Sequence, residues 1–139
     1  MGKVIKYRSI KKYKYELMES VILLTGIIPY TAAITPFLSI THNGLLNIRK
    51  GYAWDGASGP SVDTDNIMRG SLVHDALYQL IRDGIIDPTK KPAVDALLRK
   101  ICLEDGMSKF RAWYVWKAVV WFGTFALKPL SIIIKEIGR

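Results

Sequence analysis

The chain has 139 residues, of which 50% are hydrophobic and 23% are charged, and its formal net charge is +8. This length predicts one domain, residues 1–139, and this composition excludes global disorder. The one cysteine, Cys102, excludes an internal disulfide. Its apolar helical surroundings predict a small buried side chain rather than a reactive thiol.

Basic residues crowd the N-terminus before the first acidic residue, Glu16 (Lys3, Lys6, Arg8, Lys11, Lys12 and Lys14). Such a cluster suits the phosphates of nucleic acid or of anionic lipid. A solvated strand face that protects a sheet edge is the more frequent explanation. No nucleic-acid-binding motif accompanies the charge, so nucleic acid is kept as a minor alternative partner.

Residues 1–50 are typical of β structure. Residues 13–17 alternate between apolar and polar side chains, as a half-buried strand does. Residues 21–28 form a β-branched run that indicates a central strand. Asn43-Gly44 lies between two apolar runs, residues 37–41 and 45–48, which predicts a hairpin.

Residues 51–65 form a glycine-rich loop, and residues 66–139 are mainly α. Each predicted helix has a start or stop signal. Thr64 or Asp65 caps the first helix, which runs to about Asp83 before Gly84. Pro92 opens the second helix, which ends near Gly106; Ser108 caps the third, which runs through Trp121; and Pro129 begins a short last helix. The class is therefore α+β: a small antiparallel N-terminal sheet followed by three to four packed helices.

Two apolar segments imitate targeting or membrane sequences. Residues 21–28 follow a basic stretch, but Pro29 breaks the run. Residues 113–134 are interrupted by Lys117 and Lys128, and the unbroken part is too short to span a bilayer. The prediction is a soluble cytoplasmic protein, with peripheral membrane contact as an option.

Adjacent His74 and Asp75 stand out in the first predicted helix. One face of that helix carries His74 with two hydroxyls (Ile67, Ser71, His74, Tyr78 and Ile81), and Asp75 points to its flank. In the second helix Asp95 sits at the edge of a buried face (Val94, Leu97, Leu98, Ile101 and Cys102). A short turn makes the helices antiparallel neighbours, so Asp95 can reach His74 and hold it as a general base.

A non-catalytic interpretation competes with this one. A lone buried histidine is more often a hydrogen-bonded core residue, and a His-Asp-Tyr-Asp cluster can staple two helices together. With Asp75, Asp95 and Asp55 included, the catalytic and the non-catalytic interpretations are about equally favoured. Carboxylates that converge cost folding free energy unless a charge or a metal compensates them.

Calcium is the metal that the residue types favour. The candidate ligands are hard oxygens, from Asp75, Asp55 and the backbone carbonyls of residues 51–59. Glycines let such a loop turn its carbonyls toward a cation. The sequence contains no Cys and His set suited to zinc.

Two resemblances arise from these motifs. Trp54-Asp-Gly-Ala-Ser-Gly-Pro60, with Gly70-Ser-Leu-Val-His-Asp-Ala-Leu-Tyr78 and then Val94-Asp95, resembles an uncharacterised family common in bacteriophage genomes, over roughly residues 11–123. This implies a phage or prophage origin without an established activity.

His74-Asp75 followed by Tyr78, after a glycine-rich loop, is similar to the site of secreted phospholipases A2. That resemblance implies His74 as general base, Asp75 as calcium ligand, and loop carbonyls near Trp54, Gly56 and Ser58. It also implies that Asp95 orients His74, that Tyr78 supports Asp95, and that Asp65 matches an acidic residue before the central helix. The chain lacks that family's disulfides and adds an N-terminal β region of about fifty residues.

The leading hypothesis is a small phage-encoded, calcium-dependent hydrolase of a phospholipid-like ester. Trp113, Trp116 and Trp121 and the basic N-terminus would then touch a membrane, although such a stripe is more often core. The first alternative is a non-enzymatic phage protein that binds a small anionic ligand near Asn66, a host protein or a virion component. The second is a metal-dependent phosphohydrolase using His42, His74, Asp75 and Asp95.

Overall fold

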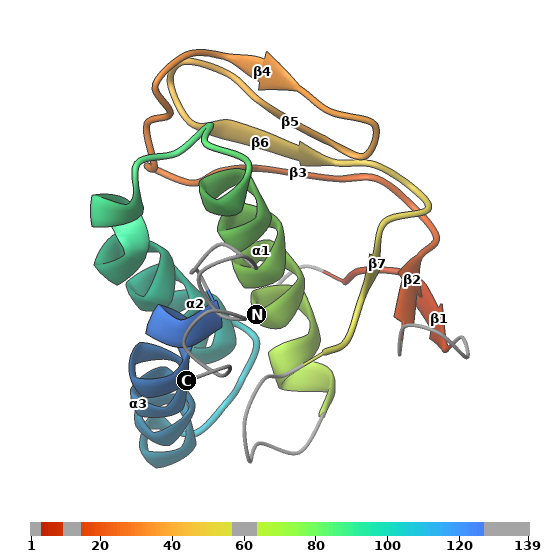
Figure 1. Ribbon diagram of the computed structural model, residues 1–139. Coiled ribbons are helices and arrows are strands. Elements are labelled where there is room, and N and C mark those ends of the chain that lie inside the picture. The colour runs from red at the N-terminus through yellow and green to blue at the C-terminus, as the bar shows by residue number, and fades with distance from the viewer. Residues whose placement is uncertain (1–3, 10–14, 57–63, 127–139) are drawn as a thin grey trace, which may run out of the picture.

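The computed structural model describes residues 4–9, 15–56 and 64–126. In this part of the chain, antiparallel sheets come first and three α-helices follow, so the predicted α+β class is confirmed (Figure 1). The strands are β1 (Tyr7–Ser9), β2 (Tyr15–Leu17), β3 (Val21–Leu24), β4 (Ala33–Ile34), β5 (Leu38–Ile40), β6 (Leu45–Ile48) and β7 (Ala53–Trp54). The helices are α1 (Asp65–Arg82), α2 (Lys91–Glu104) and α3 (Lys109–Ala126), with a 3-10 turn, η1 (Pro88–Lys90), before α2.

The described strands form two sheets rather than one. β1, β2 and β7 make a three-stranded sheet, and the other has the strand order β3-β6-β5-β4. The predicted hairpin is confirmed: β5 and β6 pair with Leu38 opposite Ile48 and Ile40 opposite Leu46. Its turn is closed by the Gly44 amide, which donates to the Thr41 carbonyl at 2.9 Å.

The expectation of a central strand over residues 21–28 is wrong. β3 ends at Leu24 and lies at the edge of its sheet, where Leu24 is 64% exposed. The Thr25 hydroxyl donates to the Gly44 carbonyl at 2.7 Å and accepts the Ile27 amide at 3.0 Å. These bonds turn the chain away from the β-sheet hydrogen bonding after Leu24. An apolar run in the sequence predicts a strand but does not say whether that strand is central or at an edge.

Helix α1 lies alongside α2, and its C-terminal end lies next to the four-stranded sheet (Figure 1). Its bounds agree with the prediction, since Thr64 precedes it and Gly84 follows it with φ of +78°. A positive φ suits glycine best, so the helix cannot continue there at low cost. Side chains of α1 and of the sheet share one core and are fully buried (Leu72, Leu77, Leu80, Leu38, Leu46 and Ile48).

Gly70 lies where α1 packs closely against α2. A Cβ atom built on Gly70 would lie 2.9 Å from both Cys102 Sγ and Leu98 Cδ1. The predicted burial of Cys102 is confirmed, and burial raises the pKa of its thiol to about 12. The missing side chain at Gly70 therefore allows the close helix pair on which the site depends.

Helix α3 packs on α2 through small side chains and exposes aromatic side chains on its other side (Phe110, Trp113, Tyr114 and Trp121). Ala112, Val115 and Val119 are buried, whereas Trp113 is 43% and Trp121 80% exposed. The expectation that the aromatic stripe is core is wrong for these two tryptophans, because the helix is apolar on both sides and only one side meets α2.

Ser108 caps α3 as predicted, its hydroxyl accepting the Arg111 amide at 3.2 Å. The helix predicted from Pro129 and residues 13 and 14 of the first predicted strand lie outside the described residues.

Candidate functional site

His74 of α1 and Asp95 of α2 meet inside the molecule. His74 Nε2 lies 2.7 Å from Asp95 Oδ1, and the two residues are only 5% and 0% exposed. Asp95 was expected at the edge of the buried face of α2, but it is fully buried. A hydrogen bond to a carboxylate places the proton on Nε2 and fixes the orientation of the imidazole ring.

Asp95 is charge-compensated by donors on both of its oxygens. The Tyr78 hydroxyl donates to Oδ1 at 2.5 Å, and the Lys91 ammonium donates to Oδ2 at 2.7 Å. Burial tends to raise the pKa of Asp95, but its bonds to His74, Lys91 and Tyr78 outweigh burial and hold the pKa below its ordinary value. Asp95 is therefore a buried anion, which explains how it can lie in the core rather than at its edge.

Lys91 is the site residue that the sequence reasoning missed. Its ammonium also donates to the backbone carbonyl of Val120 in α3 at 3.2 Å, so it joins α3 to Asp95. The available signal was the spacing of Lys91 and Asp95, which are four residues apart on one helix. Oppositely charged residues at that spacing face each other.

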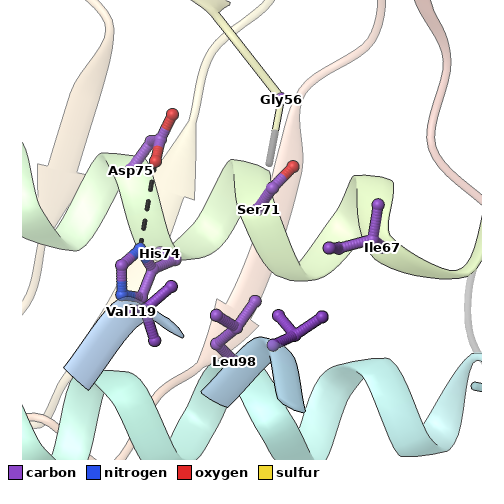
Figure 2. Close-up of a pocket in the computed structure, with 8 residues that line it drawn as sticks. Gly56, Ile67, Ser71, His74, Asp75, Leu98 and Val119 are labelled. Atoms are coloured by element: carbon purple, nitrogen blue, oxygen red, sulfur yellow. Dashed lines mark ion pairs between the residues drawn. The ribbon is translucent and has the colours of Figure 1, made fainter. Parts of the chain in front are cut away.

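The other ring nitrogen of His74 faces Asp75. Nδ1 lies 3.9 Å from Asp75 Oδ1, the ion pair drawn as a dashed line in Figure 2. Burial lowers the pKa of His74, but Asp75 and Asp95 on its two sides outweigh burial, and the net pKa is raised. The imidazole thus lies between two carboxylates that favour its protonated form.

The negative charge of Asp75 is less well compensated than that of Asp95. Its side chain is 27% exposed, yet burial by the surrounding protein raises its pKa above the ordinary value. His74 opposes this shift, and the negative charge of Asp55 adds to it. Asp55 is exposed, in the bend after β7. Asp55, the other carboxylate predicted to bind metal, therefore acts on Asp75 through its charge, and it is the smallest of the influences on the pKa of Asp75.

A small cavity adjoins the histidine. It has a volume of about 10 Å³ and is lined by Gly56, Ile67, Ser71, His74, Asp75, Leu98, Val115 and Val119. A cavity of this size holds about one water molecule. Figure 2 shows His74 and Leu98 from facing helices beside Val119 of α3, so α3 forms one wall of the cavity.

The start of the glycine-rich loop is tied to α1. The Trp54 indole donates to the Ser71 hydroxyl at 3.1 Å, and that hydroxyl donates in turn to the Met68 carbonyl at 3.0 Å. Ser71 is thus engaged away from His74. Gly56 is buried, lines the cavity and has φ of +84°, a conformation that side chains other than glycine rarely adopt. Ser58 lies outside the described residues.

The N-terminus of α1 is occupied by a side chain from α3. Arg111 donates to the Thr64 hydroxyl at 2.6 Å and to Asn66 Oδ1 at 3.3 Å. Asp65, at the first position of α1, is exposed. The predicted anion cradle near Asn66 therefore contains a cation that already bonds two of its polar groups.

His42 is exposed in the turn between β5 and β6. Across residues 4–9, 15–56 and 64–126, no three His, Cys, Asp or Glu side chains form a group that could hold a metal ion. The four-ligand arrangement of the phosphohydrolase alternative has no counterpart among these residues.

A family model described as "Protein of unknown function (DUF1353)" matches residues 34–119, more than half of the chain. The chain belongs to this family. The matched range contains His74, Asp75, Lys91 and Asp95 and leaves β1 to β3 outside. No curated protein and no solved structure matches the chain.

Two further features concern hydropathy and charge. Within the described residues, no helix has both the length and the hydropathy needed to cross a membrane. On the basic N-terminal segment, Lys6 pairs with Glu19 at 3.1 Å and Arg8 with Glu16 at 3.0 Å. Lys3, Lys11, Lys12 and Lys14 lie outside the described residues.

Proposed function

We propose that this protein is a small phage-encoded hydrolase of phospholipid-like esters, in which His74 is the general base and a calcium ion is held beside it. The observation that carries the proposal is the bond from His74 Nε2 to the buried Asp95, while Nδ1 faces Asp75 and both His74 and Asp75 line the small cavity. A histidine whose one nitrogen is fixed by a carboxylate, and which lines a water-sized space, is the arrangement that supports general-base catalysis.

In this mechanism His74 Nδ1 takes a proton from a water molecule, whose oxygen attacks the ester carbonyl. The Nε2 proton stays bonded to Asp95, and the Asp95 charge stabilises the imidazolium that forms. The proton then passes from Nδ1 to the alkoxide leaving group. Tyr78 and Lys91 contribute by keeping Asp95 anionic and in place.

The residues present suit a hard cation. Asp75 and Asp55 are near enough that the charge of one raises the pKa of the other, and a cation between them would relieve that repulsion. We propose that these carboxylates, with backbone carbonyls near Trp54, Gly56 and Ser58, would hold calcium. Calcium bound there would supply positive charge against the oxyanion of the tetrahedral intermediate.

Calorimetry with calcium tests the metal site directly. The wild-type protein and Asp83→Asn, a matched change at the exposed Asp83, should bind calcium, whereas Asp75→Asn should not. Release of fatty acid from phospholipid vesicles should then require both calcium and His74. Absence of calcium binding by the wild type at millimolar concentration rejects the hydrolase proposal.

A non-enzymatic role is the second candidate, and the near-complete burial of His74 and Asp95 favours it. In that case His74, Tyr78 and Asp95 form a buried hydrogen-bonded cluster that holds α1 and α2 together. The protein would then bind a small anionic ligand, a host protein or a virion component. His74→Ala separates the two candidates. If the cluster is structural, the variant should lose much of its stability. If His74 is catalytic, the variant should stay folded and lose turnover.

A further inference from the structure

Helix α3 has an apolar face that no described part of the protein covers. The inner face, with Ala112, Val115 and Val119, is buried. The outer face is also apolar, so the helix is hydrophobic on both sides. A helix of that kind normally has a partner on each side, within the protein or in a membrane.

The exposed side chains form one continuous stripe along α3. Phe110, Trp113, Tyr114, Lys117 and Trp121 recur at spacings of three and four residues, which places them on one face. Phe110 is 76% and Trp121 80% exposed, and Tyr114 is 42% exposed. We call these five residues the aromatic face.

Cations lie within and beside the aromatic face. Lys109 and Lys117 are exposed on α3, and the sequence of α3 contains no acidic residue. The Arg99 guanidinium of α2 lies 5.2 Å from the centroid of the Trp116 ring, and Lys117 Nζ lies 5.6 Å from it. Tryptophan beside lysine and arginine is the composition of segments that lie in the interfacial layer of a membrane.

A shallow groove flanks the aromatic face. It has a volume of about 500 Å³ and is lined by Ala96, Arg99, Lys100, Leu103, Glu104 and Trp116. Its one acidic side chain, Glu104, is paired with Arg69 at 2.9 Å, so the unpaired charge that the groove presents is positive. Both the face and the groove therefore suit a surface that is negatively charged and apolar beneath.

We propose that the aromatic face of α3 docks this protein on an anionic phospholipid bilayer. Charge complementarity selects this occupant, since a second copy of a chain with net charge +8 would bring the same cations together. The exposed aliphatic residues of the four-stranded sheet, such as Leu24 and Ile34, lack this aromatic and cationic composition. The docking requires neither calcium nor hydrolysis, so it stands apart from the proposed reaction.

Co-sedimentation of the full chain with vesicles, in EDTA, tests this surface. The wild type should bind vesicles that contain phosphatidylglycerol and bind pure phosphatidylcholine vesicles much less. Phe110→Ser and Trp121→Ser, at the two most exposed aromatic positions, should each weaken binding roughly tenfold. Lys117→Gln should weaken binding about fivefold on the anionic vesicles only.

Ile34→Ser is the matched control, because Ile34 is 76% exposed on the sheet and its change removes a similar apolar contact elsewhere. Binding should survive this change, and circular dichroism establishes that each variant is folded. Three results would overturn the proposal: no binding of the wild type to anionic vesicles, equal binding by the wild type and the α3 variants, or a lipid-free dimer that Trp121→Ser dissociates in sedimentation velocity.

Discussion

Lys91 and Asp95 lie one turn apart on α2, and the Lys91 ammonium contacts Asp95 Oδ2 at 2.7 Å while Oδ1 is left to His74 and Tyr78. The two oxygens thus have separate tasks. One is neutralised by a fixed cation, and the other orients the imidazole. This division keeps a charged carboxylate stable in a fully buried position.

Replacing Lys91 should reveal how much free energy it costs to hold the Asp95 carboxylate in its buried position. Lys91→Met removes the cation and leaves Asp95 Oδ2 without a donor, so the free energy of unfolding should fall by about 2 kcal/mol. Urea denaturation measures it. Lys90→Met is the control, because Lys90 is exposed on the adjacent turn and should change stability little. Equal effects of the two changes would show that the contact with Asp95 is unimportant.

Removing the Tyr78 hydroxyl should cost more than removing that of Tyr52. Tyr78 donates to a buried anion at 2.5 Å, whereas Tyr52 donates to the neutral amide of Gln79 at 3.2 Å. Tyr78→Phe should therefore destabilise the protein by about 2 kcal/mol and Tyr52→Phe by about 1 kcal/mol. Both tyrosines are buried, so denaturation curves of the two variants compare like with like. A reversed order would contradict the assignment of Asp95 as an anion.

The stability that His74 and Asp95 contribute should depend on pH in two directions. The pKa of His74 is raised from 6.5, so its contribution is complete below about 6.5 and is lost as the pH rises through the folded value. The pKa of Asp95 is lowered from 3.8, so its contribution is complete above about 3.8 and is lost as the pH falls through the folded value.

Both contributions are present between about pH 3.8 and pH 6.5. The difference in unfolding free energy between the wild type and His74→Gln, measured in EDTA, should therefore be largest in that window. If that difference instead grew above pH 7, the histidine would be buried in its neutral form. The same raised pKa means that hydrolysis by a His74 base should increase toward alkaline pH.

Gly70→Ala should destabilise the protein although alanine favours helices. Propensity alone predicts a gain of about 1 kcal/mol. The new Cβ would meet Cys102 and Leu98 at 2.9 Å, and such overpacking costs about 1–3 kcal/mol. Combining Gly70→Ala with Cys102→Ala should recover part of the loss, which a double-mutant cycle measures. Simple additivity of the two changes would mean that α2 moves away without strain.

Local signals predicted much of the fold. The bounds of α1 follow from Thr64 and Gly84, and Asn43-Gly44 identifies the β5–β6 hairpin. The contact between His74 and Asp95 follows from helical spacing and a short connection between the helices. For α1 and the hairpin the information lies in a few neighbouring residues, and for His74 and Asp95 it lies in the spacing along two consecutive helices.

Features decided by distant packing were not predicted. The run that begins at Val21 indicates a strand, but the partner of β3 decides that it lies at an edge. The aromatic side chains of α3 are compatible with core or surface, and contact with α2 through Val115 and Val119 selects the surface for Trp113. The full burial of Asp95 likewise depends on three donors brought together by two helices.

The bond from Lys91 to the Val120 carbonyl has a consequence for communication across the protein. Val120 belongs to the helix whose outer side we assign to the lipid surface, and Lys91 also holds Asp95. A small shift of α3 on contact with a bilayer would be transmitted through one lysine to the carboxylate that orients His74. The membrane and the imidazole would then be mechanically coupled, with the Lys91 ammonium as one linkage between α3 and Asp95.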